Sequence, residues 1–337
     1  MDLIPVAASP DCLLNGVAVS PQGRVFSSFP RWTSLATPSV AEATSDGSFT
    51  PYPGNHWNAW EPGLAAQDRI VSAHAVYCDA WNRLWVVDDA TPRVVPAVEG
   101  AAKLVKIDLE SDRVSRVYPL GSDLLPKGSM IGHVRVDERF AYVTEAHHGA
   151  IIVVDLETGR SRKLLSRDKS TRADPSIVPM IEGREFRRND GKVPLLHVDL
   201  LELSGDAKWL YFMPLFGPVL RRVETRFLQD DTLADEQIAA RVEDVIRVPP
   251  LAGITADRAG CLYFCSITED AILRMDNDRK LQTLVSDPRI SFPNEPAVGP
   301  DGYLYFPSSQ IHRLPLFGAG ASRVLPPFRV FKFMLPK

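Results

Sequence analysis

The sequence predicts an all-β protein built from several similar antiparallel sheets. One phrase recurs six times along the 337 residues: a short apolar strand, a turn containing Asp, Gly or Asn, and a second strand rich in aromatic residues. Its copies begin near residues 16, 75, 133, 200, 253 and 295, about 56 residues apart on average, so six units account for nearly the whole chain. The 28 prolines and 21 glycines supply the turns that so many short strands require.

Each copy is followed by further strand-like runs, such as those over 150–165 and 271–284. Two hairpins per unit make a four-stranded sheet, which cannot bury both of its faces alone. Radial packing of several sheets buries those faces and leaves few exposed edges. We therefore predict a single domain over residues 1–337, folded as a six-bladed β-propeller with four-stranded antiparallel blades.

Three segments depart from the repeat. The apolar residues of 232–246 follow a helical period, and Thr232 is a suitable N-cap, so we predict one short helix between blades four and five. The proline-rich stretch 31–69 is predicted to be a long loop that can cover one end of the ring. The C-terminal run 328–334 is predicted to be a closing strand that pairs within a terminal blade.

Composition narrows the class of protein. Apolar residues make up 45% of the chain and charged residues 24%, which is typical of a globular fold, and a net charge of −4 argues against nucleic acid as a partner. No apolar run approaches the roughly 18–20 residues that span a bilayer. The start of the sequence lacks a basic, apolar leader, so we expect a cytoplasmic location, no membrane partner and a monomer or small homo-oligomer. The four cysteines lack paired metal-site spacing and are expected to be reduced.

Six segments of the chain carry a resemblance to a known family: 15–32, 83–88, 149–165, 170–179, 197–212 and 292–306. They resemble the Yellow/major royal jelly protein family, including its bacterial members that are often labelled gluconolactonase-like. The resemblance runs from about residue 12 to the end of the chain. It implies a six-bladed propeller with a small-molecule pocket on the central axis. Members of the family bind biogenic amines, are associated with dopachrome conversion, or have structural or carrier roles, and the fold is similar to that of lactone-hydrolysing regucalcin and gluconolactonase enzymes.

The repeat also predicts where a site lies. The innermost strand of each blade lines the channel, so equivalent positions at the strand starts converge near one mouth. Buried carboxylates and imidazoles are costly unless they have partners, so polar groups here predict a ligand, a metal or mutual pairing. The aligned positions are Asn15, His74, Gly132, Asp199, Ala252 and Asn294, followed by Gly16, Ala75, His133, Leu200, Gly253 and Glu295.

From these positions we expect His74, His133, Asp199 and Glu295 to be catalytic. Substrate-binding candidates are the polar Asn15, His197 and Asn294 and the aromatic Phe29, Trp57, Trp60 and Phe216.

Each polar candidate also has a structural explanation. Asn15 can form a turn, His74 can bond to a backbone carbonyl, and His133 can point between blades. The side chains of His197 and Asp199 share a strand face and can pair with each other to fix blade four.

Three mechanisms remain open. In the first, Asn15, Asp199 and Glu295 hold one divalent cation (Ca, Mg, Mn or Zn), which polarises a lactone carbonyl and lowers the pKa of bound water. Lactonases of this fold place oxygen ligands on blades one, three, four and five, and Gly132 and Ala252 depart from that pattern.

The second mechanism needs no metal. A histidine, His74 or His133, is the general base and Asp199 or Glu295 its partner, an arrangement suited to tautomerisation, isomerisation or hydrolysis. In the third there is no reaction, and aromatic walls hold an amine or a phenol.

The expected function is that of a small-molecule enzyme, a lactonase-type hydrolase of a cyclic metabolite. The alternatives are a dopachrome-type tautomerase or isomerase and a non-catalytic binder. No nucleotide cofactor is expected, since the glycines of 318–321 lack a strand–turn–helix context. His147 and His148 are expected to be solvated in a hairpin turn.

Overall fold

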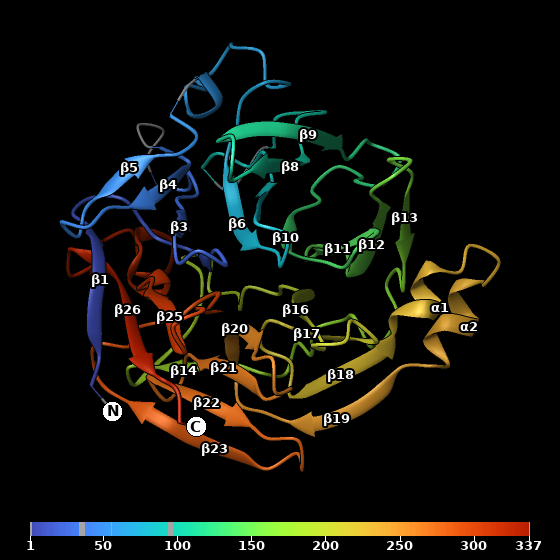
Figure 1. Cartoon of the computed structure of the whole chain (residues 1–337). Helices are drawn as coiled ribbons and strands as arrows, with labels where there is room; N and C mark the ends of the chain where they lie inside the picture. Colours follow the sequence, from blue (N-terminus) through green and yellow to red (C-terminus); the bar gives the residue numbers. More distant parts are fainter. Residues whose placement is uncertain (1, 34–37, 55, 94–96, 337) are drawn as a thin grey trace.

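Six four-stranded antiparallel sheets surround one axis in the computed structural model, which describes residues 2–33, 38–54, 56–93 and 97–336 (Figure 1). The prediction of a six-bladed propeller with four-stranded blades is therefore confirmed. In each of the first five blades, consecutive strands are hydrogen-bonded neighbours from the axis outward. We call the strand nearest the axis the inner strand.

Each of the first three blades contains four strands in chain order. Blade one contains β2 (Val17–Val19), β3 (Val25–Ser28), β4 (Val40–Ala43) and β5 (Phe49–Pro51), blade two contains β6 (Ala73–Cys78), β7 (Arg83–Asp88), β8 (Lys103–Asp108) and β9 (Arg113–Pro119), and blade three contains β10 (Ile131–Val136), β11 (Phe140–Glu145), β12 (Ala150–Asp155) and β13 (Ser161–Leu164).

The remaining blades follow the same plan with insertions. Blade four contains β16 (Val198–Leu203), β17 (Trp209–Pro214), β18 (Val219–Glu224) and β19 (Glu243–Arg247), blade five contains β20 (Leu251–Ala256), β21 (Leu262–Ser266), β22 (Ala271–Met275) and β23 (Leu281–Ser286), and blade six contains β24 (Ala297–Val298), β25 (Tyr303–Ser308), β26 (Phe328–Met334) and β1 (Ile4–Ser9). A two-stranded hairpin, β14 (Met180–Ile181) and β15 (Arg184–Glu185), precedes blade four, and two 3₁₀ turns, η2 (Ile311–Arg313) and η3 (Pro315–Phe317), follow β25.

The ring is closed within blade six. The C-terminal strand β26 pairs with β25 on one side and with the N-terminal strand β1 on the other. The expectation that residues 328–334 close a terminal blade is met, and the second half of the closure is made by β1, which the repeat did not identify. The two termini consequently lie near each other at the rim of the ring (Figure 1).

The hydrophobic core is divided among the interfaces between blades. One cluster of buried side chains fills each of the six contacts around the ring, for example Phe26, Val76 and Leu84 between blades one and two. Cys261 and Cys265 are buried between blades five and six, and all four cysteines are free, as predicted. Each sheet therefore buries both of its faces against its neighbours.

The recurring turn acid and aromatic residue explain why the repeat is visible in the sequence. In blades two, three, five and six, a carboxylate in the first turn accepts a hydrogen bond from an aromatic side chain on the second strand. These bonds fix the hairpin of each blade. The pairs are Asp79 with Trp85 at 2.8 Å, Asp137 with Tyr142 at 2.7 Å, Asp257 with Tyr263 at 2.7 Å and Asp301 with Tyr305 at 2.8 Å.

Two of the predicted segments differ in the structure. Instead of one helix between blades four and five, two short helices, α1 (Thr225–Gln229) and α2 (Asp235–Ala239), lie within blade four between β18 and β19. Residue 232 is not an N-cap, because the Thr232 hydroxyl donates to Asp230 and the cap of α2 is Ala234. The stretch 31–69 is not one long loop, since it contains β4, β5 and the turn η1 (His56–Asn58).

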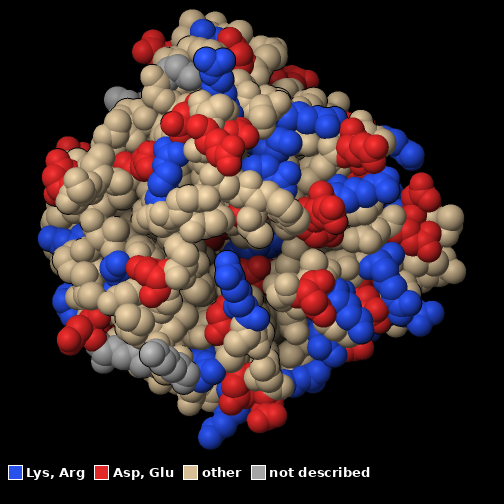
Figure 2. Space-filling model, viewed as in Figure 1, with Lys and Arg blue, Asp and Glu red and all other residues tan. Residues whose placement is uncertain are grey.

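Charged side chains of both signs are scattered over the face seen in Figure 2, with no large area of a single sign. A hollow opens at the centre of the ring on this face. Within the described residues, no helix has the length and apolar character needed to cross a membrane.

Candidate functional site

Two cavities lie along the axis, one at each end of the inner strands. The larger, which we call the upper cavity, has a volume of about 530 Å³ and is lined by the residues at the starts of the inner strands. The smaller, the lower cavity, has a volume of about 170 Å³ and is lined by residues further along the same strands. The upper cavity is of the size that holds a small organic molecule.

The floor of the upper cavity is polar and its walls are largely apolar. The walls come from insertions as well as from the blades. The floor includes Asn15, His74, His133, Asp199 and Asn294, and the walls include Trp32, Met130, Phe186, Leu196, Phe292 and Phe317.

Bulges in the inner strands direct the floor residues toward the axis. In blades two to five, the pairing of the inner strand with the second strand is irregular at its start, and the residue at the irregularity is one that lines the cavity. A bulge turns a side chain out of the regular alternation, and bulges are frequent beside active sites. The irregularities fall between Ala73 and Ala75, Ile131 and Val134, Val198 and Leu200, and Leu251 and Gly253.

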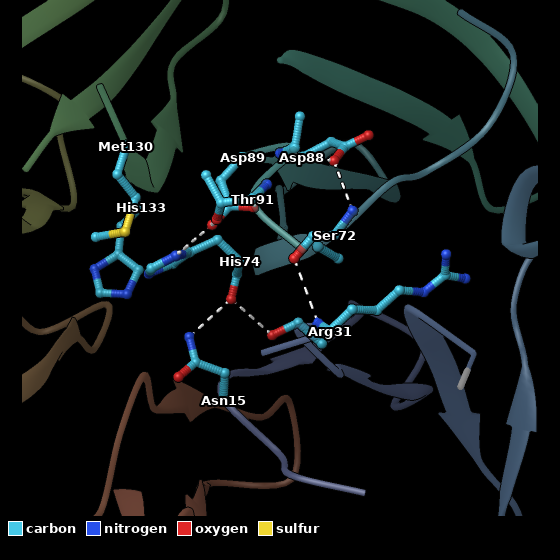
Figure 3. A network of polar contacts seen from close by, with 12 residues as sticks. Asn15, Arg31, Ser72, His74, Asp88, Asp89, Thr91, Met130 and His133 are labelled. Carbon is cyan, nitrogen blue, oxygen red and sulfur yellow. Dashed lines mark hydrogen bonds and ion pairs between the residues drawn. The ribbon is translucent and has the colours of Figure 1, made fainter. Parts of the chain in front are cut away.

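Both the imidazole ring and the backbone carbonyl of His74 have polar partners. Its Nδ1 lies 3.3 Å from Oδ2 of Asp89, and that carboxylate accepts hydrogen bonds from the backbone N–H and the hydroxyl of Thr91 at 2.9 and 2.6 Å. The His74 carbonyl accepts a bond from the Asn15 amide at 2.8 Å (Figure 3). The ring is therefore oriented by a buried carboxylate, as a general acid or base requires.

His133 lies beside His74, with ring centroids 5.8 Å apart and nearly perpendicular planes (Figure 3). Its Nε2 is buried and has no hydrogen-bond partner in the structure. Burial, and then the nearby charges of His74 and Arg135, holds the pKa of His133 well below its ordinary value. His133 is therefore a neutral imidazole at neutral pH.

The pKa of His74 moves in the opposite direction. Burial lowers it, but the hydrogen bond with Asp89 opposes burial. The negative charges of Asp199, Asp89 and Glu295 add to that bond, so that the pKa of His74 is raised overall. Two adjacent imidazoles thus favour opposite protonation states, which is how an enzyme separates an acid from a base.

Asp199 completes the floor. Its Oδ1 is buried without a hydrogen-bond partner, and burial raises the pKa of this carboxyl against the opposing charge of His74. The carboxylate occupies the space beside Gly132 where any larger residue would place its Cβ. Gly132 therefore makes room for the acid of the neighbouring blade.

Asn15 and Asn294 form a chain of amides across blades six, one and two. The Asn294 amide donates to the Asn15 side-chain oxygen at 2.8 Å, and the Asn294 side-chain oxygen accepts the backbone N–H of Glu295 at 2.9 Å. These bonds engage both amide oxygens and stiffen the floor beneath the histidines.

Glu295 lies deeper than predicted. It lines the lower cavity, and its Oε1 contacts the Arg135 guanidinium at 3.3 Å. Burial raises the pKa of Glu295 to about 7, against the opposing charge of Arg135. Its carboxylate reaches this depth past Gly16, which leaves the space open.

Several predicted binding residues lie away from the upper cavity. Phe29, Trp57, Trp60 and Phe216 are buried in hydrophobic clusters and do not line it. The His197 ring does not line it either, because its Nδ1 accepts the Ala173 N–H at 3.0 Å.

Other residues of the site, some of which line the cavity, were not predicted. Asp89 orients His74, and its only sequence signal is the carboxylate pair that ends the second strand of blade two. The aromatic walls come from Trp32, Phe186 and Phe317, which lie in irregular segments outside the repeat. His147 lines the cavity rather than being fully solvated, with its Nδ1 2.6 Å from the Gly128 carbonyl.

The three proposed ligands, Asn15, Asp199 and Glu295, do not come together to hold one divalent cation. Among the described residues, no three His, Cys, Asp or Glu side chains are placed to hold one. The Asn15 oxygen accepts a bond from Asn294, and Glu295 pairs with Arg135 in the other cavity, so of the three candidates Asp199 alone faces the upper cavity with a free oxygen. The departures at Gly132 and Ala252 agree with this geometry.

Solved structures with the same fold include several enzymes. A streptogramin B lyase is 15% identical with a TM-score of 0.55, covering 98% of this chain and 96% of its own. A gluconolactonase from Xanthomonas campestris is 12% identical with a TM-score of 0.56, covering 99% and 89%. A luciferin-regenerating enzyme is 10% identical with a TM-score of 0.57, covering 99% and 95%. At these identities the likeness concerns the fold alone.

Comparison at the level of sequence gives a narrower result. No curated protein matches the chain. The family described as major royal jelly protein matches residues 71–317, which is most of the 337 residues and includes five of the six inner strands. The chain therefore belongs to the major royal jelly protein family.

Proposed function

We propose that this protein is an acid–base enzyme that opens the ring of a small, largely apolar lactone. The observation that carries the proposal is the pair His74 and His133 on the floor of the upper cavity, with rings 5.8 Å apart and pKa values displaced in opposite directions. The structures of a gluconolactonase and a streptogramin B lyase, which share the fold, support an enzyme, and the name of the first supports a lactone as substrate.

In this mechanism neutral His133 takes a proton from a water molecule as its oxygen attacks the lactone carbonyl. His74, protonated and oriented by Asp89, donates a hydrogen bond to the carbonyl oxygen as negative charge develops there. When the ring C–O bond breaks, His74 gives its proton to the leaving alkoxide. Transfer of a proton from His133 to His74 through solvent restores the pair, and the net reaction adds one water.

A dopachrome-type tautomerase is the second candidate, and a specific observation favours it. Two imidazoles on the same side of one cavity can remove a proton from one atom of a ring and return it to a nearby atom. The aromatic side chains in the wall, such as Trp32 and Phe292, suit a planar ring.

The decisive experiment offers the purified protein lactones of increasing apolar character, dopachrome and amine or phenol ligands, and follows both turnover and thermal stability. Ring opening of lactones is expected, and it should survive exhaustive treatment with chelator because the described residues of the cavity include no ligand cluster for a cation. Dopachrome turnover without lactone turnover would select the second candidate. Stabilisation by ligands with no turnover of any compound would replace the enzyme with a binder.

The pH dependence of kcat/KM should be bell-shaped. Activity requires His133 neutral, so it rises with pH through a pKa below 6.5, and it requires His74 protonated, so it falls through a pKa above 6.5. Because the two rings interact, both limbs belong to the pair. A His56→Gln variant, in which a half-exposed ring is changed, should keep both limbs. A profile with a single limb would rule out the two-histidine mechanism.

A further inference from the structure

The lower cavity is formed by the second layer of side chains along the inner strands. Two residues beyond the positions that begin the repeat, each inner strand contributes a side chain to the lining of this cavity. The small side chains of blades one and six leave the space open, while the larger ones of blades two to five fill the rest. The layer is Ala18, Tyr77, Arg135, Glu202, Thr255 and Ala297.

The charged groups in this layer are tightly connected. Arg135 donates to Glu202 at 2.8 Å and to the carbonyls of Val134 and Ile254 at 2.8 and 3.0 Å, and it contacts Glu295 at 3.3 Å. Its guanidinium also lies 4.8 Å from the centre of the Tyr77 ring. Each of the three guanidinium nitrogens of Arg135 therefore donates to at least one fixed partner in the protein.

One carboxylate oxygen in the lower cavity does not accept a hydrogen bond. Glu202 is bonded through both oxygens, to the Leu203 N–H and to Arg135, whereas Glu295 uses Oε1 and leaves Oε2 buried without a partner. Glu295 is 2% exposed, and it lines the cavity. A buried carboxylate oxygen with no donor is costly, so a missing donor or cation is the simplest way to satisfy it.

The charges of the side chains that line the lower cavity indicate that its ligand is a cation. Two carboxylates and one guanidinium line the cavity, which leaves one negative charge in excess when both acids are ionised. We propose that the lower cavity is a binding site for a monovalent metal cation, held by Glu295 with the Thr255 hydroxyl and the Glu202 carboxylate nearby. Hard cations prefer oxygen ligands, and about 170 Å³ accommodates an ion together with a few waters at ~30 Å³ each.

This site is separate from the proposed reaction and stands without it. The ionisable side chains nearest the site are Arg135, Glu202, Tyr77, Cys78 and, from the upper cavity, His74.

The test measures thermal unfolding of the whole protein in NaCl, KCl and N-methyl-D-glucamine chloride at equal ionic strength. Near pH 8, Na⁺ or K⁺ is expected to raise Tm by about 2–4 °C above the value in the large organic cation, which the cavity cannot admit. An equal Tm in all three salts near pH 8 would overturn the site and show an ionic-strength effect only.

Two variants and a control locate the effect. Glu295→Gln removes the charge at nearly constant shape, and Ala18→Leu fills the cavity while leaving both carboxylates in place, so each should abolish the difference between the salts. Glu243→Gln changes a half-exposed carboxylate on β19 and should preserve it. If Glu295→Gln does not fold, Ala18→Leu and ²³Na line broadening of the unmodified protein still decide the matter. A salt difference that persists in Ala18→Leu would refute the assignment.

Discussion

A His74→Gln variant is expected to fold normally and to lose about 10²–10⁴-fold in kcat/KM, the range that a positioned acid or base contributes. The substitution removes the imidazole but keeps the backbone carbonyl that binds the Asn15 amide and the Ser28 hydroxyl. The network that joins blades one and two therefore survives. Steady-state kinetics and a denaturant titration measure the two quantities separately, and turnover at the unmodified rate would remove His74 from the reaction.

An Asp89→Asn variant separates positioning from chemistry. Asp89 does not need to touch the substrate, and its hydrogen bond is one of the contributions that raise the pKa of His74. Its loss should shift the alkaline limb of the pH profile to lower pH and lower kcat by less than the loss of His74 does. If the variant changes the stability but the alkaline limb of the pH profile stays at the same pH, the role of Asp89 is only structural.

A Gly253→Ala variant is expected to cause the largest loss of stability among the glycine substitutions of the inner strands. A Cβ on this residue would lie 2.6 Å from Cδ of Pro296 and 2.9 Å from the backbone of Asn294 and Glu295. These atoms cannot rotate away, so blades five and six must separate, at a cost of about 1–3 kcal/mol in the free energy of unfolding. Chemical denaturation provides the measurement.

The matched control is Gly205→Ala, where the nearest atom would be 3.6 Å away and little change is expected. Gly16→Ala provides an informative contrast, since its Cβ would meet the end of the Glu295 side chain, which can turn aside. Equal losses in Gly253→Ala and Gly205→Ala would show that the contact between blades five and six is not close.

The sequence was sufficient for the blade count because the repeat is a local pattern with a local cause. A turn carboxylate must lie a few residues before the aromatic group that it binds, as Asp257 does before Tyr263. Residues close together in the sequence therefore determine the hairpin. The equivalence of blades then places His74, His133 and Asp199 at one mouth without any further information.

The depth of a side chain along the axis could not be predicted in the same way. Glu295 follows Asn294 by one position, yet the two line different cavities, because the longer carboxylate passes Gly16 and reaches Arg135. The aromatic walls were missed because Phe186 and Phe317 lie in insertions that have no counterpart in other blades.

The helix was misplaced for a different reason. The apolar residues near 242–246 fit a helical period, but Leu220 pairs with Ile246 and Val219 with Arg247, so the end of this segment is a strand. Pairing with a neighbouring strand overrode the local pattern, as it often does for short apolar runs.

The pairing of β1 with β26 has a consequence for how the molecule is made. Ile4 lies opposite Lys332, so β1 has no partner until β26, which follows all the other strands of the propeller, is translated. Contacts between such distant residues form late, since closing a long loop carries a large entropic cost. During synthesis the nascent chain can therefore assemble the four seams among blades one to five, while both seams of blade six stay incomplete and expose apolar surface to chaperones until β26 is made.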